Sequence, residues 1–257
     1  MQALRSVLFN ALFYLNLALH IVVAIPTFVL PRRVFMAIAK SWGRTSNWLL
    51  RVVVGVKVKY RGLEKIPPGA LLVASKHQSF WEAFTLLTLF DDPAFIVKRE
   101  LMWIPFFGWL LWKADQVPVD RKAKGGAMAG MIASARKALG TGRQIIIFPE
   151  GTRTAPDAPP AYKQGIVHLY AESGVPCLPV ALNSGLFWPR RKFRRYPGTI
   201  VLEVLDPIPP GLEQEAFAAR MQQAIEIATA RLIEEGRQEL RAAGHAERAS
   251  EVSEGVR

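Results

Sequence analysis

Residues 70–82 read Ala-Leu-Leu-Val-Ala-Ser-Lys-His-Gln-Ser-Phe-Trp-Glu, and this stretch decides how the chain folds. Its first six residues form a short apolar run that is typical of a buried strand, and we expect a helix to begin at Ser79. His77 lies in the loop between the two. Because loops at the carboxyl ends of strands carry the chemistry of α/β sheets, we expect His77 to belong to a functional site.

The same alternation of short apolar runs and helical segments continues on both sides of this stretch. We expect strands at 56–60, 70–75, 94–98, 117–120, 143–148, 177–182 and 199–205, and helices at 80–90, 126–139, 163–173 and 213–241. Short apolar strands separated by helices are covered on both faces. The sequence therefore predicts an α/β fold in which a mixed, largely parallel sheet is flanked by helices.

A second polar block, Phe148-Pro149-Glu150-Gly151-Thr152-Arg153, follows the expected strand at 143–148. Gly151 lets backbone N–H groups approach a ligand closely, and the guanidinium of Arg153 can direct two parallel donors at a phosphate. A helix N-terminus keeps the imidazole of His77 neutral, so it is available as a base. Together the two blocks suit the deprotonation of an alcohol on a phosphate-bearing molecule.

Glu82 has two roles open to it. In the first, its carboxylate accepts a hydrogen bond from one ring nitrogen of His77 and leaves the other nitrogen for a substrate hydroxyl. In the second, Ser79 and Glu82 form a capping box at the start of the helix, which needs no catalysis.

The order and spacing of the two blocks resemble the 1-acylglycerol-3-phosphate acyltransferase family of glycerophospholipid acyltransferases, which carries a His-x4-Asp motif and a later Pro-Glu-Gly-Thr-Arg motif. The resemblance covers roughly residues 55–205. It implies a catalytic pair of His77 and Glu82, with Glu82 in the place of the family's aspartate. It also implies a substrate-binding set: Glu150 at the glycerol backbone, Gly151 and Thr152 beside it, Arg153 at the phosphate, and the basic residues Lys98 and Arg121 of two weaker motifs.

The implied reaction moves a fatty-acyl group from a thioester, either acyl-CoA or an acyl carrier protein, to the free hydroxyl of the lysophospholipid 1-acylglycerol 3-phosphate, giving phosphatidic acid. No cofactor is implied. No Ser or Cys occupies a nucleophile motif, so we expect the alkoxide to attack the thioester directly. The four histidines are widely spaced and Cys177 is the single cysteine, so no metal site and no intrachain disulfide are expected. We expect Cys177 to be a buried strand residue.

Two other functions stay open. One is an acyltransferase for a different lysolipid, for instance an ornithine-containing one. The Arg153 clamp favours a phosphate-bearing acceptor but does not exclude such a lipid. The other is a membrane-bound lipid- or nucleic-acid-binding protein with no turnover. The intact pair of His77 and Glu82 argues against this second alternative.

The N-terminal part of the chain indicates a membrane-associated helical hairpin. Residues 7–30 contain no Asp, Glu, Lys or Arg, and a helix of that length can cross a bilayer. A signal peptide is the competing interpretation, but Arg32 and Arg33 follow at once and favour an uncleaved anchor. A second helix at 35–54 mixes Trp42 and Trp48 with basic residues, as a headgroup-region helix or a packing helix would. We expect three parts: 1–58, the hairpin; 59–241, the acyltransferase α/β domain; and 242–257, a disordered tail.

The net charge of +12 indicates an anionic partner, and the hydrophobic fraction of 51% favours a membrane surface over nucleic acid, which we do not expect to bind. Basic residues follow the first helix and place that side in the cytoplasm. We therefore expect the protein at the inner membrane, with its active site facing the cytoplasm. The densest basic run, at 190–195, is expected to touch the anionic leaflet or to form a solvated loop.

Overall fold

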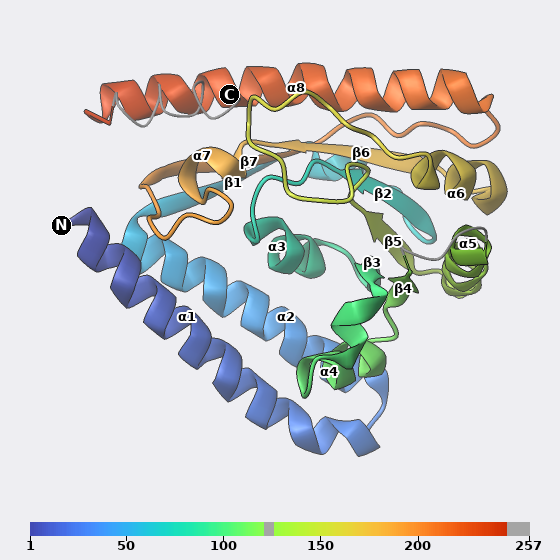
Figure 1. Ribbon diagram of the computed structural model, residues 1–257, viewed down its shortest axis with the longest axis horizontal. Coiled ribbons are helices and arrows are strands. Elements are labelled where there is room, and N and C mark those ends of the chain that lie inside the picture. The colour runs from blue at the N-terminus through green and yellow to red at the C-terminus, as the bar shows by residue number, and fades with distance from the viewer. Residues whose placement is uncertain (121–125, 246–257) are drawn as a thin grey trace.

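The computed structural model describes residues 1–120 and 126–245. At its centre lies a seven-stranded sheet with the strand order β1-β7-β6-β2-β5-β3-β4 (Figure 1). Neighbouring strands are parallel except β6 and β7, which are antiparallel. The predicted mixed, largely parallel sheet is confirmed, and its strands lie where the apolar runs predict them: β1 (Val56–Arg61), β2 (Leu71–Ser75), β3 (Pro93–Lys98), β4 (Val117–Val119), β5 (Gln144–Ile147), β6 (Cys177–Leu182) and β7 (Gly198–Val204).

Helices cover both faces of the sheet, because the apolar side chains of its strands alternate between two cores. In β2, Leu71 and Val73 enter one core and Leu72 and Ala74 enter the other. Figure 1 shows α8 along one side of the molecule and the two N-terminal helices along the opposite side. The four predicted helices of this region are confirmed: α3 (Trp81–Leu89), α5 (Gly126–Leu139), α6 (Gly165–Ser173) and α8 (Gln214–Ala242).

The N-terminal residues form a helical hairpin. Its first helix has some side chains buried in the core and others exposed on the surface. Phe9 and Phe13 are buried in the main core, and the Phe13 ring lies 5.9 Å from that of Phe84 in α3. The segment Gln2–Val29 is nevertheless long and apolar enough to cross a membrane, and most of it is not buried. The hairpin consists of α1 (Gln2–Ala24), η1 (Ile25–Val29), α2 (Arg32–Leu49) and η2 (Leu50–Val54).

The second helix of the hairpin, α2, packs along α3. A Cβ at Gly43 would lie 2.7 Å from the carbonyl oxygen of Phe84, so the two backbones approach as closely as only glycine allows. Asn47 Oδ1 accepts a 2.8 Å hydrogen bond from the indole N–H of Trp81. Trp42 is half-buried against Phe84. Of the two interpretations of this helix, the packing one therefore holds for Trp42.

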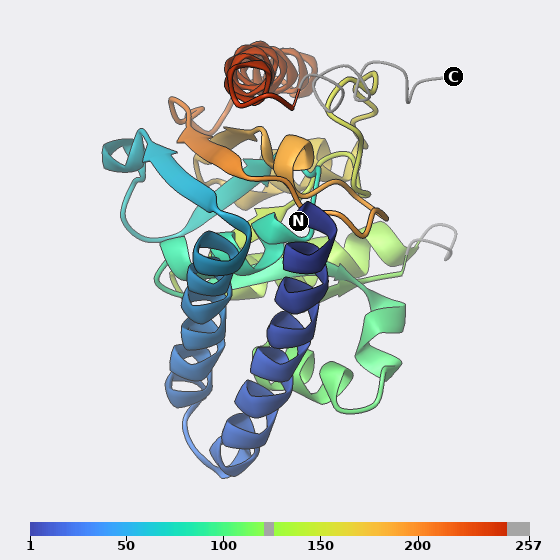
Figure 2. The ribbon, with the colours of Figure 1, turned by 90° about the vertical axis from the view of Figure 1, so that its left-hand side faces the viewer.

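A segment between β3 and β4 forms two short helices that the apolar pattern does not predict, η4 (Arg99–Trp103) and α4 (Phe107–Lys113). Figure 2 shows α4 beside the hairpin. Lys113 Nζ joins the two by donating hydrogen bonds of 3.0 and 2.7 Å to the carbonyl oxygens of Phe28 and Leu30. The outer surface of this segment carries four exposed aromatic side chains: Trp103, Phe106, Trp109 and Trp112.

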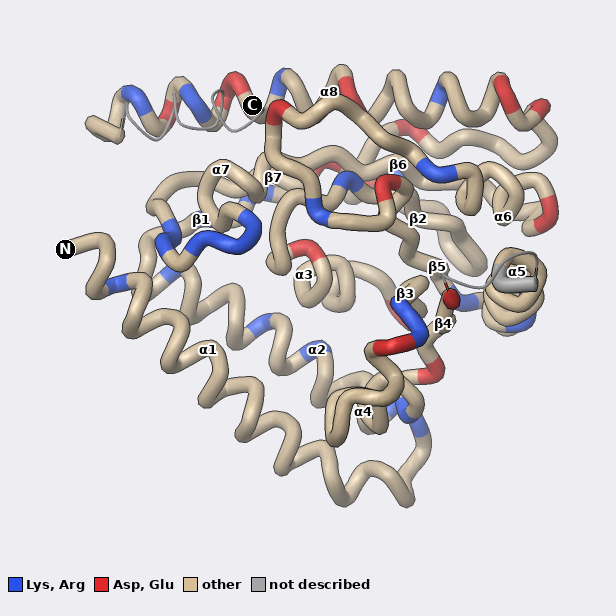
Figure 3. Tube along the Cα trace, in the orientation of Figure 1, with Lys and Arg blue, Asp and Glu red and all other residues tan. Residues whose placement is uncertain are grey.

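The basic run at 190–195 links α7 (Ser184–Phe187) to β7, and Figure 3 shows its positive charges gathered near the start of α1. Its last residue is a buried anchor rather than a solvated charge. Arg195 Nη2 lies 3.2 Å from Asn10 Oδ1 of α1, and its guanidinium lies 4.6 Å from the Trp188 ring. Burial lowers the pKa of Arg195 to about 10. Arg191, Lys192 and Arg194 are exposed.

Candidate active site

The carboxyl ends of the parallel strands β3, β5, β2 and β6 lie at one edge of the sheet. His77 follows β2 and Phe148 follows β5. Their rings are stacked, with centroids 3.8 Å apart and planes 14° from parallel. The backbone N–H of Thr154 donates a 2.9 Å hydrogen bond to the carbonyl oxygen of His77. His77 and Phe148 are 71 positions apart in the sequence. The two blocks that contain them are thus in direct contact.

The start of α3 has one of the two hydrogen bonds of a capping box, the one from the Ser79 N–H to the Glu82 carboxylate. The Oγ of Ser79 accepts a 3.0 Å hydrogen bond from the N–H of Trp81, and the carboxylate of Glu82 accepts one of 3.0 Å from the N–H of Ser79. The helix begins at Trp81 rather than at Ser79, and Phe80 is its N-cap.

The carboxylate of Glu82 also faces His77, but it does not form the hydrogen bond that the orienting role predicts. The closest atoms, His77 Nδ1 and Glu82 Oε2, are 3.9 Å apart, which exceeds hydrogen-bond length. Glu82 Oε1 instead accepts bonds from the N–H of Gln78 at 2.9 Å and from the hydroxyl of Ser184 at 2.5 Å. At 3.9 Å the carboxylate still acts on the imidazole through its charge.

The environment of Glu82 changes the acidity of its side chain. Complete burial raises the pKa of Glu82 from its ordinary value of 4.5 to about 7, while hydrogen bonds from Ser184, Gln78 and Ser79 oppose this rise. A carboxyl group with this pKa changes its charge near neutral pH. Such groups concentrate at functional sites.

Glu150, the carboxylate of the second block, is buried beneath the turn and engaged inside the protein. Its Oε1 lies 3.0 Å from the ammonium of Lys76, and its Oε2 accepts a 2.9 Å hydrogen bond from the hydroxyl of Thr154. The side chains of Glu150 and Lys76 are each 1% exposed. The contact of Glu150 with a glycerol backbone stays a prediction.

The rest of the second block forms an open turn. Gly151 has a φ of +69°, in the left-handed region that glycine adopts freely, and its N–H donates to the carbonyl oxygen of Phe148 at 2.8 Å. Thr152 is exposed and Arg153 is half-buried. The pKa of Arg190 is lowered by desolvation, by Arg191 and by the positive charge of Arg153. Arg190 is therefore a second cation near Arg153, one that sequence reasoning assigned only to the basic run.

A third strand end completes the site and was missed from the sequence. At the end of β6, Ser184 donates to Glu82, and the N–H of Gly185 donates a 3.0 Å hydrogen bond to Gln78 Oε1. A Cβ at Gly185 would lie 3.0 Å from that of Gln78. Because β6 pairs with β2 in parallel, the rule that strand ends meet at one edge could have identified this segment.

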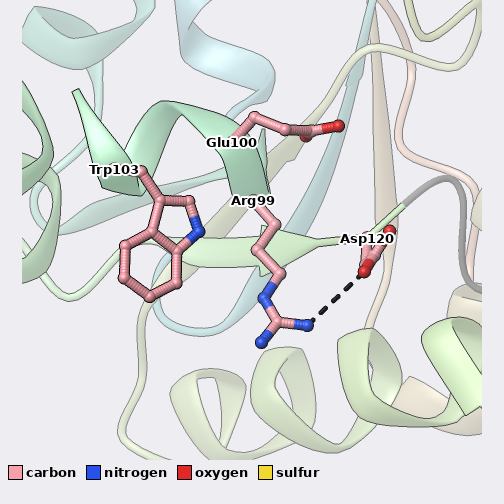
Figure 4. A pocket seen from close by; sticks show the side chains of 4 residues that line it. All are labelled: Arg99, Glu100, Trp103 and Asp120. Atoms are coloured by element: carbon pink, nitrogen blue, oxygen red, sulfur yellow. Dashed lines mark hydrogen bonds and ion pairs between the residues drawn. The ribbon is translucent and has the colours of Figure 1, made fainter.

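Of the two weaker basic candidates, the structure describes only Lys98. Lys98 ends β3 and is exposed at the same edge of the sheet. Beside it, a cavity of about 300 Å³ is lined by Arg99, Glu100, Trp103 and Asp120. Figure 4 shows Arg99 directed at Asp120, with 3.4 Å between Nη1 and Oδ2. Arg121 lies outside the residues that the structure describes.

Neither a thiol nor a metal centre contributes to this edge of the sheet in the described part of the chain. Cys177 is buried in β6, as predicted, and burial raises the pKa of its thiol. Among residues 1–120 and 126–245, no group of three or more His, Cys, Asp or Glu side chains is placed to hold a metal ion.

Comparison with known proteins gives related sequences. A family model described as Acyltransferase matches residues 57–183. The 1-acyl-sn-glycerol-3-phosphate acyltransferase of Pseudomonas aeruginosa is 36% identical over 203 residues, which cover 77% of this chain and 78% of that protein. The alpha form of that enzyme from Homo sapiens is 31% identical over 163 residues, covering 62% of this chain and 58% of that protein.

A solved structure shows the same architecture. The crystal structure of the 1-acyl-sn-glycerophosphate (LPA) acyltransferase PlsC from Thermotoga maritima matches 90% of this chain and 98% of its own, with a TM-score of 0.74 and 23% sequence identity. That likeness establishes the shared fold. With the family match and the Pseudomonas relative, it leads to one conclusion: the chain belongs to the acyltransferase family.

Proposed function

We propose that the protein transfers a fatty-acyl group from a thioester to the free hydroxyl of 1-acyl-sn-glycerol 3-phosphate and so forms phosphatidic acid. The observation that carries this proposal is the stacking of His77 on Phe148, which brings a base against the turn that holds Arg153. A base next to an anion clamp fits an acceptor that has its hydroxyl and its phosphate on one small glycerol unit. The names of the curated relatives support the same acceptor.

In this reaction His77 removes the proton from the acceptor hydroxyl, and the alkoxide attacks the thioester carbonyl. The tetrahedral intermediate collapses, the carbon–sulfur bond breaks, and His77 returns its proton to the departing thiolate. Glu82, 3.9 Å from the ring, stabilises the imidazolium that exists between these two steps. The guanidinium of Arg153 binds the phosphate, with Arg190 and Lys98 adding positive charge. The donor is acyl-CoA or an acyl carrier protein.

A substrate panel tests this function. Purified protein in detergent is given 1-acyl-sn-glycerol 3-phosphate, other lysophospholipids and lyso-ornithine lipid, each with acyl-CoA and with acylated carrier protein, and products are identified by mass. We expect phosphatidic acid as the main product. Faster acylation of an acceptor without phosphate would favour an acyltransferase for another lysolipid. If no pair of substrates gave a product, the remaining interpretation would be a lipid-binding protein without turnover.

The proposed location of the enzyme is the inner membrane, with the active site at the cytoplasmic surface. Exposed apolar side chains run along α1 and η1, from Leu4 to Val29 at the tip of the hairpin. The η4–α4 segment, which Lys113 joins to that tip, carries four further exposed aromatic side chains. Trp residues favour the bilayer interface, where an apolar ring meets polar headgroups. Because Phe9 and Phe13 hold α1 against the domain, we propose that the hairpin lies in one leaflet rather than crossing the bilayer.

Vesicle flotation tests this membrane contact. The double variant Trp109→Ser/Trp112→Ser should bind anionic vesicles more weakly than the wild type. Its matched control is Ile227→Ser, since Ile227 is 64% exposed on α8, at the opposite side of the molecule. Equal binding by both variants and the wild type would exclude the η4–α4 segment from the membrane contact.

A further inference from the structure

Lys76 is a buried cation that the proposed reaction does not use. It lies between β2 and His77, and its side chain is 1% exposed. An isolated ammonium group is strongly disfavoured at such a place, so its partners hold it in a defined position. Its Nζ lies 3.0 Å from Glu150 Oε1 and 2.7 Å from Glu226 Oε1.

The contact with Glu226 reaches a helix that is distant in sequence. Glu226 lies in α8, 150 positions after Lys76, and its side chain is 27% exposed. The same Oε1 accepts a 2.7 Å hydrogen bond from the hydroxyl of Tyr162, in the loop before α6. The Tyr162 ring centroid is 5.8 Å from Lys76 Nζ. One side of the ammonium is therefore fixed by the outer layer of the fold.

The contact with Glu150 reaches the phosphate-binding turn. Glu150 stands three residues before Arg153 and, through its bond with Thr154, ties the turn to the carbonyl oxygen of His77. Lys76 is also the residue immediately before His77. The ammonium therefore joins the strand end that carries the base to the strand end that carries the anion clamp.

We propose that Lys76 is a positioning residue, which together with Glu226 sets the separation between the base His77 and the clamp Arg153. This inference rests on the proposed function, in which both side chains act on one acceptor molecule. The acceptor hydroxyl and phosphate are fixed on one glycerol, so a change in that separation weakens acceptor binding and misaligns the hydroxyl. The thioester donor does not bridge the two side chains and is unaffected.

Neutral variants test the inference without changing side-chain shape. Glu226→Gln keeps the Tyr162 hydrogen bond and removes only the charge, whereas Lys76→Met removes the ammonium. The matched control is Glu235→Gln, which breaks another α8 ion pair, 2.7 Å long, with Arg61 of β1. Each variant is assayed for the KM of the acceptor, the KM of the donor, kcat and the melting temperature.

We expect Glu226→Gln to raise the acceptor KM about tenfold and to leave the donor KM unchanged, because modest displacements of positioned groups have effects of this size or larger. Lys76→Met should lose about 100-fold in kcat/KM for the acceptor, and adding Glu226→Gln to it should cause little further loss. Glu235→Gln should change neither KM.

A role in stability alone would lower the melting temperature and the active fraction while leaving both KM values as they are. Wild-type KM values for the acceptor in Glu226→Gln would overturn the inference even if Lys76→Met failed to fold. Equal rises in the acceptor and donor KM values would also overturn it. A wild-type protein that makes no phosphatidic acid from 1-acyl-sn-glycerol 3-phosphate would instead refute the proposed function, so the two failures are distinguishable.

Discussion

Glu82, in the first turn of α3, and Glu150, in the turn after β5, are two buried carboxylates that the protein holds in opposite ways. The hydrogen-bond donors to Glu82 are neutral groups, namely backbone N–H groups and the hydroxyl of Ser184. Glu150 meets the ammonium of Lys76 at 3.0 Å and the hydroxyl of Thr154. The side chain of the first is 0% exposed and that of the second 1%, so burial does not distinguish them.

The difference shows that the partner, rather than burial, decides what a buried carboxylate does. Neutral donors offset only part of the desolvation of Glu82, so its pKa rises to about 7 and its charge can respond to a nearby imidazolium. An ammonium balances the charge of Glu150, which becomes a fixed part of the framework. On this view Glu82 serves the chemistry and Glu150 serves the geometry.

The largest expected effect comes from the base that Glu82 faces. His77→Ala should lower the single-turnover rate by about 10²–10⁴-fold, the usual range for loss of a general base. Melting temperature and vesicle binding, measured alongside, should match the wild type. A variant that keeps the wild-type rate would refute the mechanism and remove the catalytic role of Glu82 with it.

Glu82→Gln should lower kcat by about 10- to 100-fold, because it removes the negative charge that stabilises the His77 imidazolium from 3.9 Å away. In a His77→Ala background the same change should have no further effect. Glutamine still caps the helix, so near-normal turnover would leave Glu82 as a cap only.

The stability of this variant gives a second readout. Because the native state raises the pKa of Glu82 from 4.5 to about 7, native protein binds the proton more tightly, and this contribution to stability is lost as pH rises through that interval. The Glu82→Gln variant lacks this dependence. Its melting temperature above pH 7 should therefore be no lower than that of the wild type.

Arg153→Lys tests the clamp that Glu150 supports. Lysine keeps the positive charge but loses the two parallel donors, so we expect the acceptor KM to rise about tenfold and the donor KM to stay constant. Initial rates over both substrate concentrations give the two values. Equal effects on both substrates would assign Arg153 to the donor or to a structural role.

The smallest effect separates the two carboxylates most directly. Ser184→Ala and Thr154→Val each remove one hydroxyl donor, the first from Glu82 and the second from Glu150. Since the Ser184 hydrogen bond lowers the pKa of Glu82, its loss should move the midpoint of the rate–pH profile to higher pH. Thr154→Val should leave that midpoint in place, because Lys76 still balances Glu150. Equal shifts in both variants would contradict the comparison.

The positions of the strands follow from the sequence because each strand is a local apolar run bounded by polar turns. The η4–α4 segment does not follow, since it packs on the hairpin tip through Lys113 and turns its aromatic side chains outward. No local periodicity encodes such a surface. The hairpin also does more than the anchoring that its composition predicts, because Phe9 and Phe13 complete the core.

The candidate site was predictable as far as single motifs extend. His77 and the 148–153 block can be identified from their residue types and from their positions after strands. Lys76 does not, because a lysine beside a strand is usually solvated and its two partners come from positions 150 and 226. The hydrogen bond from Ser184 to Glu82 is likewise absent from any single motif, because Ser184 begins α7, after a third strand.

The glycine at position 43 has a consequence for protein engineering. It lets α2 lie against the backbone of α3, the helix whose first turn carries Glu82. A chimera that exchanged residues 1–54 for an unrelated membrane anchor would still reach the bilayer, yet it would leave α3 without its closest neighbour. The anchor of this enzyme is therefore not an interchangeable module, and a replacement must reproduce the close contact at Gly43 and the hydrogen bond from Trp81 to Asn47.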